Sequence, residues 1–228
     1  MVCITADQTQ PLSIRSSNQI IDGQGHTVPS ISVAANHVTI EHFVVSGGSQ
    51  IGIQVRGVGN VVQDNDISHI RYGTDDADAM RFFGDNTKIL RNRVHDLVAG
   101  PMKDAHPDCV QTFATDGSGG GSSHFEFAGN HCEGPEGHGQ CVMAEGPTST
   151  DGGGGGPGRS MNWSIHDNYC ATHSAQAIAL RGIDNVTVAN NNFTKGTGTE
   201  AVQATDGSSG LVVKNNVLGT GYRALTGE

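Results

Sequence analysis

A six-residue pattern, apolar-x-x-Asn-x-apolar, recurs along this chain and constrains its fold more than any other feature. Its asparagines are separated by 27, 38, 38, 23 and 25 residues and are Asn65, Asn92, Asn130, Asn168, Asn191 and Asn216. A small residue and a short apolar run alternate with these copies, and the central residues of the runs are Ile53, Met80, Val110, Val142, Ile178, Val202 and Leu225. Two strand-like patterns that share one irregular period predict stacked coils of about 22 to 25 residues with insertions.

The composition agrees with a solenoid of this kind. The chain has 33 glycines among 228 residues and only 5% aromatic residues, which indicates many turns and disfavours a helical bundle. An asparagine at each bend can hydrogen-bond to its equivalents on the neighbouring coils and satisfy backbone groups that a tight turn leaves without partners. We therefore expect an asparagine ladder. A β-propeller is the alternative, but its blades need roughly 40 or more residues.

The order of the two patterns resembles the right-handed parallel β-helix of the pectate-lyase type. The stretch "IIDGQGHTV" at 20–28 is similar to the first coil of many such proteins. The resemblance implies an all-β fold with residues 1–228 in a single parallel β-helix domain. The chain stops at "YRALTGE", just inside a coil, so a fragment that lacks a C-terminal cap is also an open reading.

Four of the five cysteines occupy equivalent places on successive coils. Cys109 and Cys141 match in the second pattern, and Cys132 and Cys170 match in the first. Neighbouring parallel strands lie about 4.8 Å apart, within the range that disulfides bridge. We expect either the disulfides Cys109–Cys141 and Cys132–Cys170 or two stacked pairs of free thiols, with Cys3 left over. Disulfides would imply an oxidising compartment.

The charge of the chain limits its partners. The formal net charge is −10, which disfavours nucleic acids and anionic membranes. An acidic polysaccharide remains allowed if its groove is locally basic. No apolar stretch of roughly 18 residues is present, so we expect no membrane-spanning helix. We expect a secreted monomer whose leader is absent from this chain.

Insertions and reactive side chains gather on the same central coils. Glycine-rich segments at 115–124 and 150–160 predict mobile loops beside the coils of Met80, Val110 and Val142. Aligning the second pattern on these coils predicts one patch of polar side chains, formed by Arg81, His106, Asp108, Gln111, His138, Gln140 and Glu145.

This patch suits a uronic-acid polymer. Removing the proton at C5 of a uronate requires that the neighbouring carboxylate be neutralised. Candidates for that binding role are Arg81, Arg181, Lys103, Gln111, Gln140 or a bound cation such as Ca²⁺, and Glu145 lies in the same patch. His106, tuned by Asp104 or Asp108, is the predicted base, and His138 is the predicted acid or second base. The sequence specifies no cofactor.

Two further resemblances leave other reactions open. The segment Asp104-Ala105-His106-Pro107-Asp108 is similar to the Asp-Pro-His-Asp segment of mannuronan C5-epimerases, although Ala105 replaces the proline and the second acid stands one residue later. This likeness implies an epimerase with Asp104 and His106 in its site. The "GHG" at 137–139 is similar to a motif of polygalacturonases, which use carboxylates as acid and base.

The leading prediction is a polysaccharide lyase that cleaves a uronate-containing glycan by C5 proton abstraction and β-elimination. The alternatives are a C5-epimerase, a polygalacturonase-like hydrolase, and a non-catalytic glycan-binding or adhesion solenoid. His106, Asp108 and His138 could also bind a transition metal, because two histidines and one carboxylate form a known ligand set.

Overall fold

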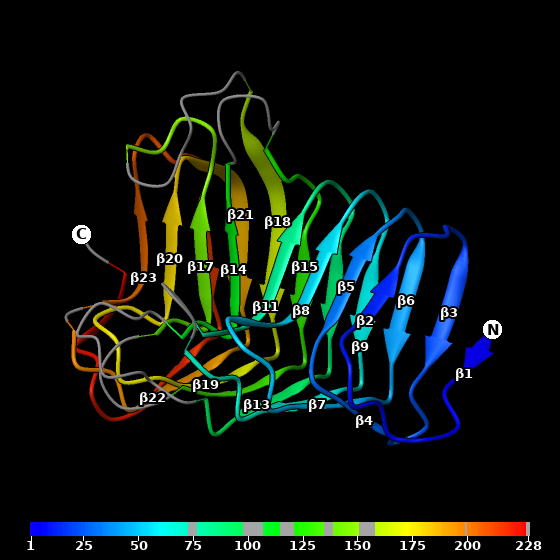
Figure 1. Cartoon of the computed structure of the whole chain (residues 1–228). Helices are drawn as coiled ribbons and strands as arrows, with labels where there is room; N and C mark the ends of the chain where they lie inside the picture. Colours follow the sequence, from blue (N-terminus) through cyan, green and yellow to red (C-terminus); the bar gives the residue numbers. More distant parts are fainter. Residues whose placement is uncertain are drawn as a thin grey trace.

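The chain folds into a right-handed parallel β-helix, as the sequence predicted. The computed structural model describes residues 1–72, 77–97, 107–114, 121–134, 139–150, 158–198 and 200–226, and within them there are strands but no helix. Each coil passes through three parallel sheets, and the coils stack from the N-terminus at one end to the C-terminus at the other (Figure 1). No helix in these ranges is long and apolar enough to cross a membrane.

Along each coil the chain passes through sheet 1, then sheet 2, then sheet 3. Sheet 1 consists of β1 (Val2–Cys3), β3 (Gln19–Asp22), β6 (Val38–Glu41), β9 (Val61–Gln63), β12 (Lys88–Leu90), β15 (Glu126–Ala128), β18 (Ser160–His166), β21 (Ile183–Ala189) and β24 (Val212–Lys214). Sheet 2 consists of β4 (Thr27–Val28), β7 (Val44–Ser46), β10 (Asp66–Ser68), β13 (Arg93–His95), β16 (His131–Glu133), β19 (Tyr169–Ala171), β22 (Asn192–Thr194) and β25 (Val217–Leu218). Sheet 3 consists of β2 (Leu12–Ile14), β5 (Ile31–Ala34), β8 (Ile51–Arg56), β11 (Asp78–Phe83), β14 (Val110–Phe113), β17 (Val142–Glu145), β20 (Ile178–Arg181), β23 (Glu200–Thr205) and β26 (Ala224–Thr226).

The apolar places of both sequence patterns form continuous inward columns. In sheet 1 the first pattern runs in register through Ile40, Val62, Ile89, Phe127, Ile165, Val188 and Val213. In sheet 3 the second pattern runs through Ile53, Met80, Val110, Val142, Ile178 and Val202. The assignment of Leu225 to this column is wrong by one residue, because Val202 pairs with Thr226. Stacked apolar side chains thus fill the interior of the solenoid.

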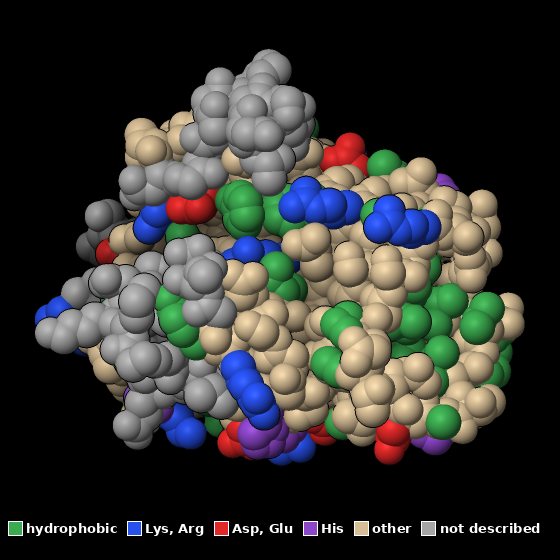
Figure 2. All heavy atoms as spheres, in the orientation of Figure 1, with side chains coloured by type: hydrophobic (Ala, Val, Ile, Leu, Met, Phe, Trp, Pro, Cys, Tyr) green, Lys and Arg blue, Asp and Glu red, His purple; other side chains and the backbone are tan. Residues whose placement is uncertain are grey.

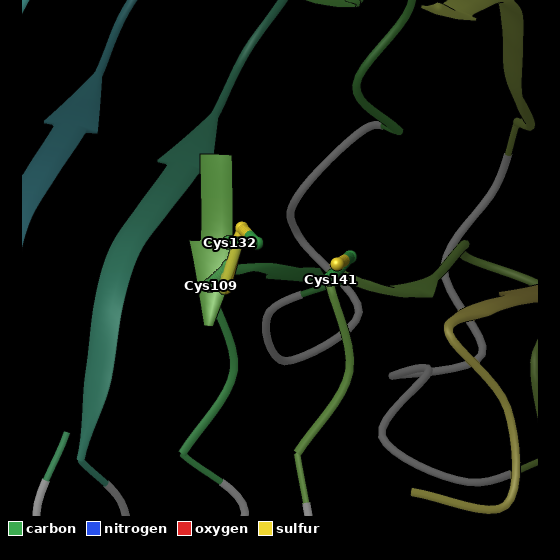
Figure 3. A group of neighbouring side chains, drawn as sticks. All are labelled: Cys109, Cys132 and Cys141. Carbon is green, nitrogen blue, oxygen red and sulfur yellow. A yellow bond between two sulfur atoms is a disulfide. The ribbon is translucent and has the colours of Figure 1, made fainter. Parts of the chain in front are cut away.

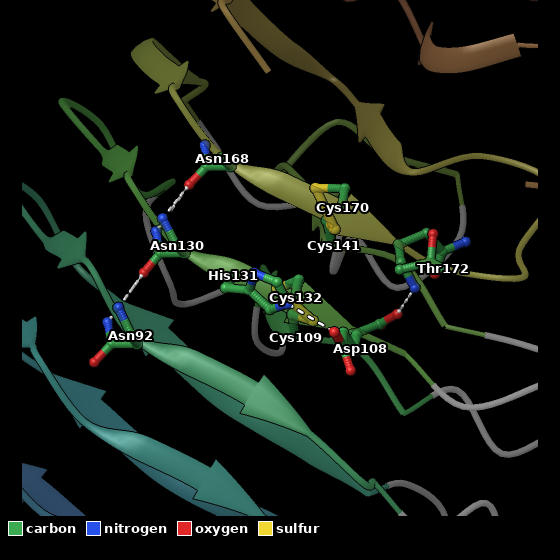
Figure 4. Close-up of a disulfide and its surroundings, with 12 residues drawn as sticks. Asn92, Asp108, Cys109, Asn130, His131, Cys132, Cys141, Asn168, Cys170 and Thr172 are labelled. Atoms are coloured by element: carbon green, nitrogen blue, oxygen red, sulfur yellow. Dashed lines mark hydrogen bonds and ion pairs between the residues drawn. A yellow bond between two sulfur atoms is a disulfide. The ribbon is translucent and has the colours of Figure 1, made fainter. Parts of the chain in front are cut away.

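The recurrent asparagines are hydrogen-bonded from coil to coil at the bend between sheets 1 and 2. The side-chain oxygen of Asn130 accepts both the backbone and the side-chain N–H of Asn92, and Asn168 does the same for Asn130 (Figure 4). The residue before each asparagine has a positive φ, for example 56° at Asp64 and 57° at Asp167. This left-handed residue turns the chain and leaves backbone groups that the buried amides then satisfy.

An aromatic stack fills the core beneath the exit of sheet 3. The rings of Phe82 and Phe125 are stacked with centroids 4.0 Å apart, and Trp163 meets Phe125 edge-on at 4.9 Å. The indole N–H of Trp163 donates to the carbonyl of Ser122 at 2.8 Å, so its polar atom is satisfied although the ring is buried. This packing gives the outer face of sheet 3 a rigid support.

The predicted cysteine pairing, Cys109–Cys141 and Cys132–Cys170, is wrong. The bonds are Cys109–Cys132 and Cys141–Cys170, with Cα atoms 6.1 and 6.0 Å apart (Figures 3 and 4). Cys132 and Cys170 do stand in register on neighbouring strands, but side chains stacked in this way point in parallel directions. A cysteine at the entrance of sheet 3 and one in sheet 2 instead point toward each other across the corner. Cys3 is free and exposed.

Candidate functional site

Four of the six predicted binding residues lie in two columns on the outer face of sheet 3, namely Arg81, Gln111, Glu145 and Arg181. One column runs in register through Gln54, Arg81, Gln111, Met143, Ala179 and Gln203. In the other, Arg56 is paired with Phe83, Phe113 with Glu145, and Glu145 with Arg181. The alignment of the second sequence pattern therefore predicted the side-by-side placement of these residues correctly. Parallel register puts equivalent residues of successive coils next to one another, about 4.8 Å apart.

Two buried carboxylates stand at the entrance of these strands. Asp78 and Asp108 are both 0% exposed. One oxygen of Asp78 accepts the backbone N–H of Asp108 at 2.9 Å. One oxygen of Asp108, which is labelled in Figure 4, accepts the backbone N–H of Gln140 at 2.5 Å. The second oxygen of Asp78 pairs with Nε of Arg81 at 2.6 Å. Each aspartate thus holds the chain at the start of the next coil.

A second arginine–carboxylate pair lies farther along the same face. Nη1 of Arg181 is 2.9 Å from Oε1 of Glu145, and the two residues are register partners on neighbouring strands. The Glu145 side chain is only 11% exposed, so this pair is held in a partly desolvated position. Both arginines nominated from the sequence, Arg81 and Arg181, therefore have carboxylate partners within the chain.

Gln111 has a buried polar atom on the outer face of sheet 3. It is 8% exposed, and its Oε1 has no hydrogen-bond partner among the described residues. Gln111 stands in register between Arg81 and Met143 on the outer face. A buried amide oxygen without a donor costs on the order of 1–3 kcal/mol, so a partner supplied by a ligand would be favourable there.

Two arginines lie over phenylalanine rings at the exit of the central strands. The guanidinium carbon of Arg56 is 3.9 Å from the ring centre of Phe83, and that of Arg81 is 5.5 Å from the ring centre of Phe113. The two rings meet edge-on, 5.1 Å apart. Figure 2 shows basic and apolar side chains side by side on this part of the surface, near β8, β11 and β14 of Figure 1. Sequence reasoning did not nominate Arg56, although it shares a column with Glu145 and Arg181.

The chain that leaves β17 is tied to the next coils at the edge of this face. The Thr150 backbone N–H and the Ser149 hydroxyl each donate to Asp206 at 3.0 Å. The hydrogen bond from the Thr150 backbone, the largest cause, lowers the pKa of Asp206 below its usual value. Asp206 follows Thr205, the register partner of Arg181. One border of the site is therefore fixed by an ionised carboxylate at neutral pH.

Several predicted site residues lie outside the described residues. They are Lys103, Asp104, His106 and His138, together with 115–120 and 151–157 of the glycine-rich segments. Their catalytic and binding roles stay predictions. Of the proposed metal set, Asp108 alone lies within the described residues.

Two groups in the described part of the chain have side chains close enough to share a metal ion. Three of the cysteines form one group, and these are already committed to disulfides. The other group is Asp22, Glu41 and His42, at the exit of the sheet 1 strands and not on the outer face of sheet 3. Neither group supports a cation site for the candidate patch.

Comparisons with known proteins show likeness to solved structures. No protein-family model matches the chain, and no curated protein matches it. The A-module of the Azotobacter vinelandii mannuronan C-5 epimerase AlgE6 is similar over the whole of this chain and 77% of its own, with a TM-score of 0.43 and 12% sequence identity. The fold assignment rests on the three parallel sheets and their registers.

Proposed function

We propose that this chain acts on an anionic polysaccharide bound across the outer face of sheet 3, as a lyase of a uronate-containing glycan. The observation that carries the proposal is the buried amide oxygen of Gln111, which has no hydrogen-bond partner among the described residues and stands in a column with Arg81. Sugar hydroxyls donate hydrogen bonds, and arginines bind carboxylates in a bidentate manner. Gln111 and its neighbours thus match both kinds of group on an acidic sugar.

The distribution of charge supports the same face. Three of the four arginines that lie within strands are on sheet 3, namely Arg56, Arg81 and Arg181. The strands of sheet 1 carry four acids and two lysines, a net charge of −2, and those of sheet 2 carry two acids and one arginine, a net charge of −1. The strands of sheet 3 carry three acids and three arginines and are neutral. In a chain with a net charge of −10, this is the face that repels a polyanion least.

The proposed reaction is proton abstraction at C5 followed by loss of the C4 oxygen. His106 takes the proton, and His138 protonates the leaving oxygen. Gln111, Gln140 and Lys103 bind the substrate carboxylate or its hydroxyls, with Asp104 orienting His106. The bond from the Gln140 backbone to Asp108 supports a positioning role for Asp108, since it anchors the strand two residues after His106.

A non-catalytic glycan-binding solenoid is the second candidate. It is favoured by the hydrogen bonds of Asp78 and Asp108, which join successive coils as structural ladders do. In that case the same face would bind the polysaccharide without changing it.

Secretion is part of the proposal. Two disulfides support it, because such bonds persist mainly in oxidising compartments. A monomeric state stays a prediction.

The test uses a panel of polyuronates and the variant His106→Asn. A lyase produces an unsaturated, ultraviolet-absorbing product, and the variant should lower its rate by at least about 100-fold. His37→Asn, in a left-handed turn between β5 and β6 where asparagine is well tolerated, is the matched control and should keep full activity. Full activity of His106→Asn would refute the assignment of the base.

The products separate the alternatives. An altered uronate ratio without absorbance indicates an epimerase, and new reducing ends without absorbance indicate a hydrolase. Retention on a polyuronate column with no product indicates the binding solenoid. If the protein neither binds nor changes any polyuronate, the proposed function is wrong.

A further inference from the structure

We infer that Arg56, held over the ring of Phe83, recognises a carboxylate of a second acidic sugar on the same glycan chain. This inference rests on the proposed function and names its substrate class: a polymer with more than one uronate within reach of the site. Arg56 takes this role in preference to Arg81 and Arg181, the arginines that the sequence pattern nominated.

The inference rests on which arginines of this face form ion pairs. Arg81 and Arg181 are paired with Asp78 and Glu145 at 2.6 and 2.9 Å. Arg56 is exposed at the end of β8 and forms no ion pair within the described part of the chain. Of the three arginines on this face, it is the one whose charge is not balanced by a described carboxylate.

The ring of Phe83 prepares Arg56 for a bidentate ligand. The guanidinium carbon of Arg56 lies over the ring of Phe83, 3.9 Å from its centre, in a cation–π contact. The N–H groups lie in the guanidinium plane and remain available at its edges, where a carboxylate binds with two parallel hydrogen bonds. Holding the side chain in one orientation reduces the entropy lost on binding.

The spacing between Arg56 and Gln111 matches an extended ligand. The registers Phe83–Arg56, Arg81–Gln54 and Arg81–Gln111 put Arg56 two coils before Gln111 and two residues farther along the strand. With strands about 4.8 Å apart and a rise of about 3.3 Å per residue, their Cα atoms lie about 12 Å apart. A single sugar residue is shorter than this. This separation fits a glycan that extends across β8, β11 and β14 and presents one group to Arg56 and another to Gln111.

The experiment compares Arg56→Gln with Arg93→Gln in calorimetric titrations with a polyuronate oligosaccharide. Arg93 is a strand arginine of sheet 2, 56% exposed, so its variant makes the same change of charge on another face. Arg56→Gln should weaken binding about ten-fold or more, the loss expected for one charge-assisted pair. Arg56→Lys should recover only part of the affinity, and Arg93→Gln should bind within two-fold of the wild type.

A methyl-esterified oligosaccharide completes the test on the unmodified protein. Esterification removes the carboxylate charge, so wild type and Arg56→Gln should bind this ligand equally. Arg56→Gln that binds the charged ligand as tightly as Arg93→Gln overturns the role of Arg56 while leaving the proposed function intact. Failure of the wild type to bind any polyuronate overturns both.

Discussion

Replacing Asn130 by alanine should destabilise the solenoid more than any change at the ends of the asparagine ladder. Asn130 is 1% exposed, and its oxygen accepts the backbone N–H of Asn92 at 2.9 Å. Its side-chain N–H groups donate to the carbonyls of Ile89 and Ala128 and to Asn168. Alanine removes these bonds and leaves at least one buried N–H and one buried carbonyl short of a partner. At about 1–3 kcal/mol for each such group, the loss is about 2–6 kcal/mol of unfolding free energy.

Asn216 provides the matched control. It makes bonds of the same kind, to the backbone of Asn191 at 2.8 Å and to the carbonyl of Val188 at 2.9 Å, but it is half-buried at the C-terminal end of the ladder. Water can replace part of its role, so Asn216→Ala should cost about 1 kcal/mol. Equilibrium urea unfolding with intact disulfides, followed by far-ultraviolet circular dichroism, measures both values. Equal losses, or a loss below 1 kcal/mol for Asn130→Ala, would refute the ladder as a buried network.

Two further predictions concern a histidine and the cysteines. His95 lies in sheet 2 between Asp96 and Asp66; burial of the ring alone lowers its pKa, but the hydrogen bonds to the two carboxylates outweigh it and raise the pKa above the usual value. A raised folded-state pKa gives stability that is present below about pH 6.5 and is lost as the pH rises through the folded pKa. His95→Gln should therefore lower the unfolding free energy more at about pH 5.5 than at about pH 8.5, as measured by urea unfolding. The reverse order would contradict the ion pairs. Peptide mapping of the unreduced protein should give linked fragments containing Cys109–Cys132 and Cys141–Cys170. Fragments linked through Cys109–Cys141 and Cys132–Cys170 would contradict the disulfides between sheet 3 and sheet 2.

Sequence reasoning predicted the columns of side chains on the outer face of sheet 3 correctly, but not how their charges are paired. The columns through Arg81 and Gln111 followed from the repeat alone, because a parallel solenoid stacks equivalent residues coil upon coil. The repeat did not show which arginine lacks a carboxylate partner among the described residues. Asp78 lies three residues before Arg81, but only the structure shows that their side chains form an ion pair. Arg56 therefore went unnominated, because nothing in a linear pattern distinguishes a stacked guanidinium from a paired one.

What the sequence by itself determined is the order of strands, the inward residues and, except at Leu225 in the last coil, the register between coils. These properties are local and repeated: alternation within a strand chooses the buried face, and the asparagine marks the bend. What only the tertiary structure decided are the contacts between different sheets, namely the Cys109–Cys132 and Cys141–Cys170 bonds across a corner. The tertiary structure also decided how the charges on the outer face of sheet 3 are balanced. Such contacts depend on the direction in which each side chain leaves its strand, and equivalent places in a repeat do not specify that direction between one sheet and the next.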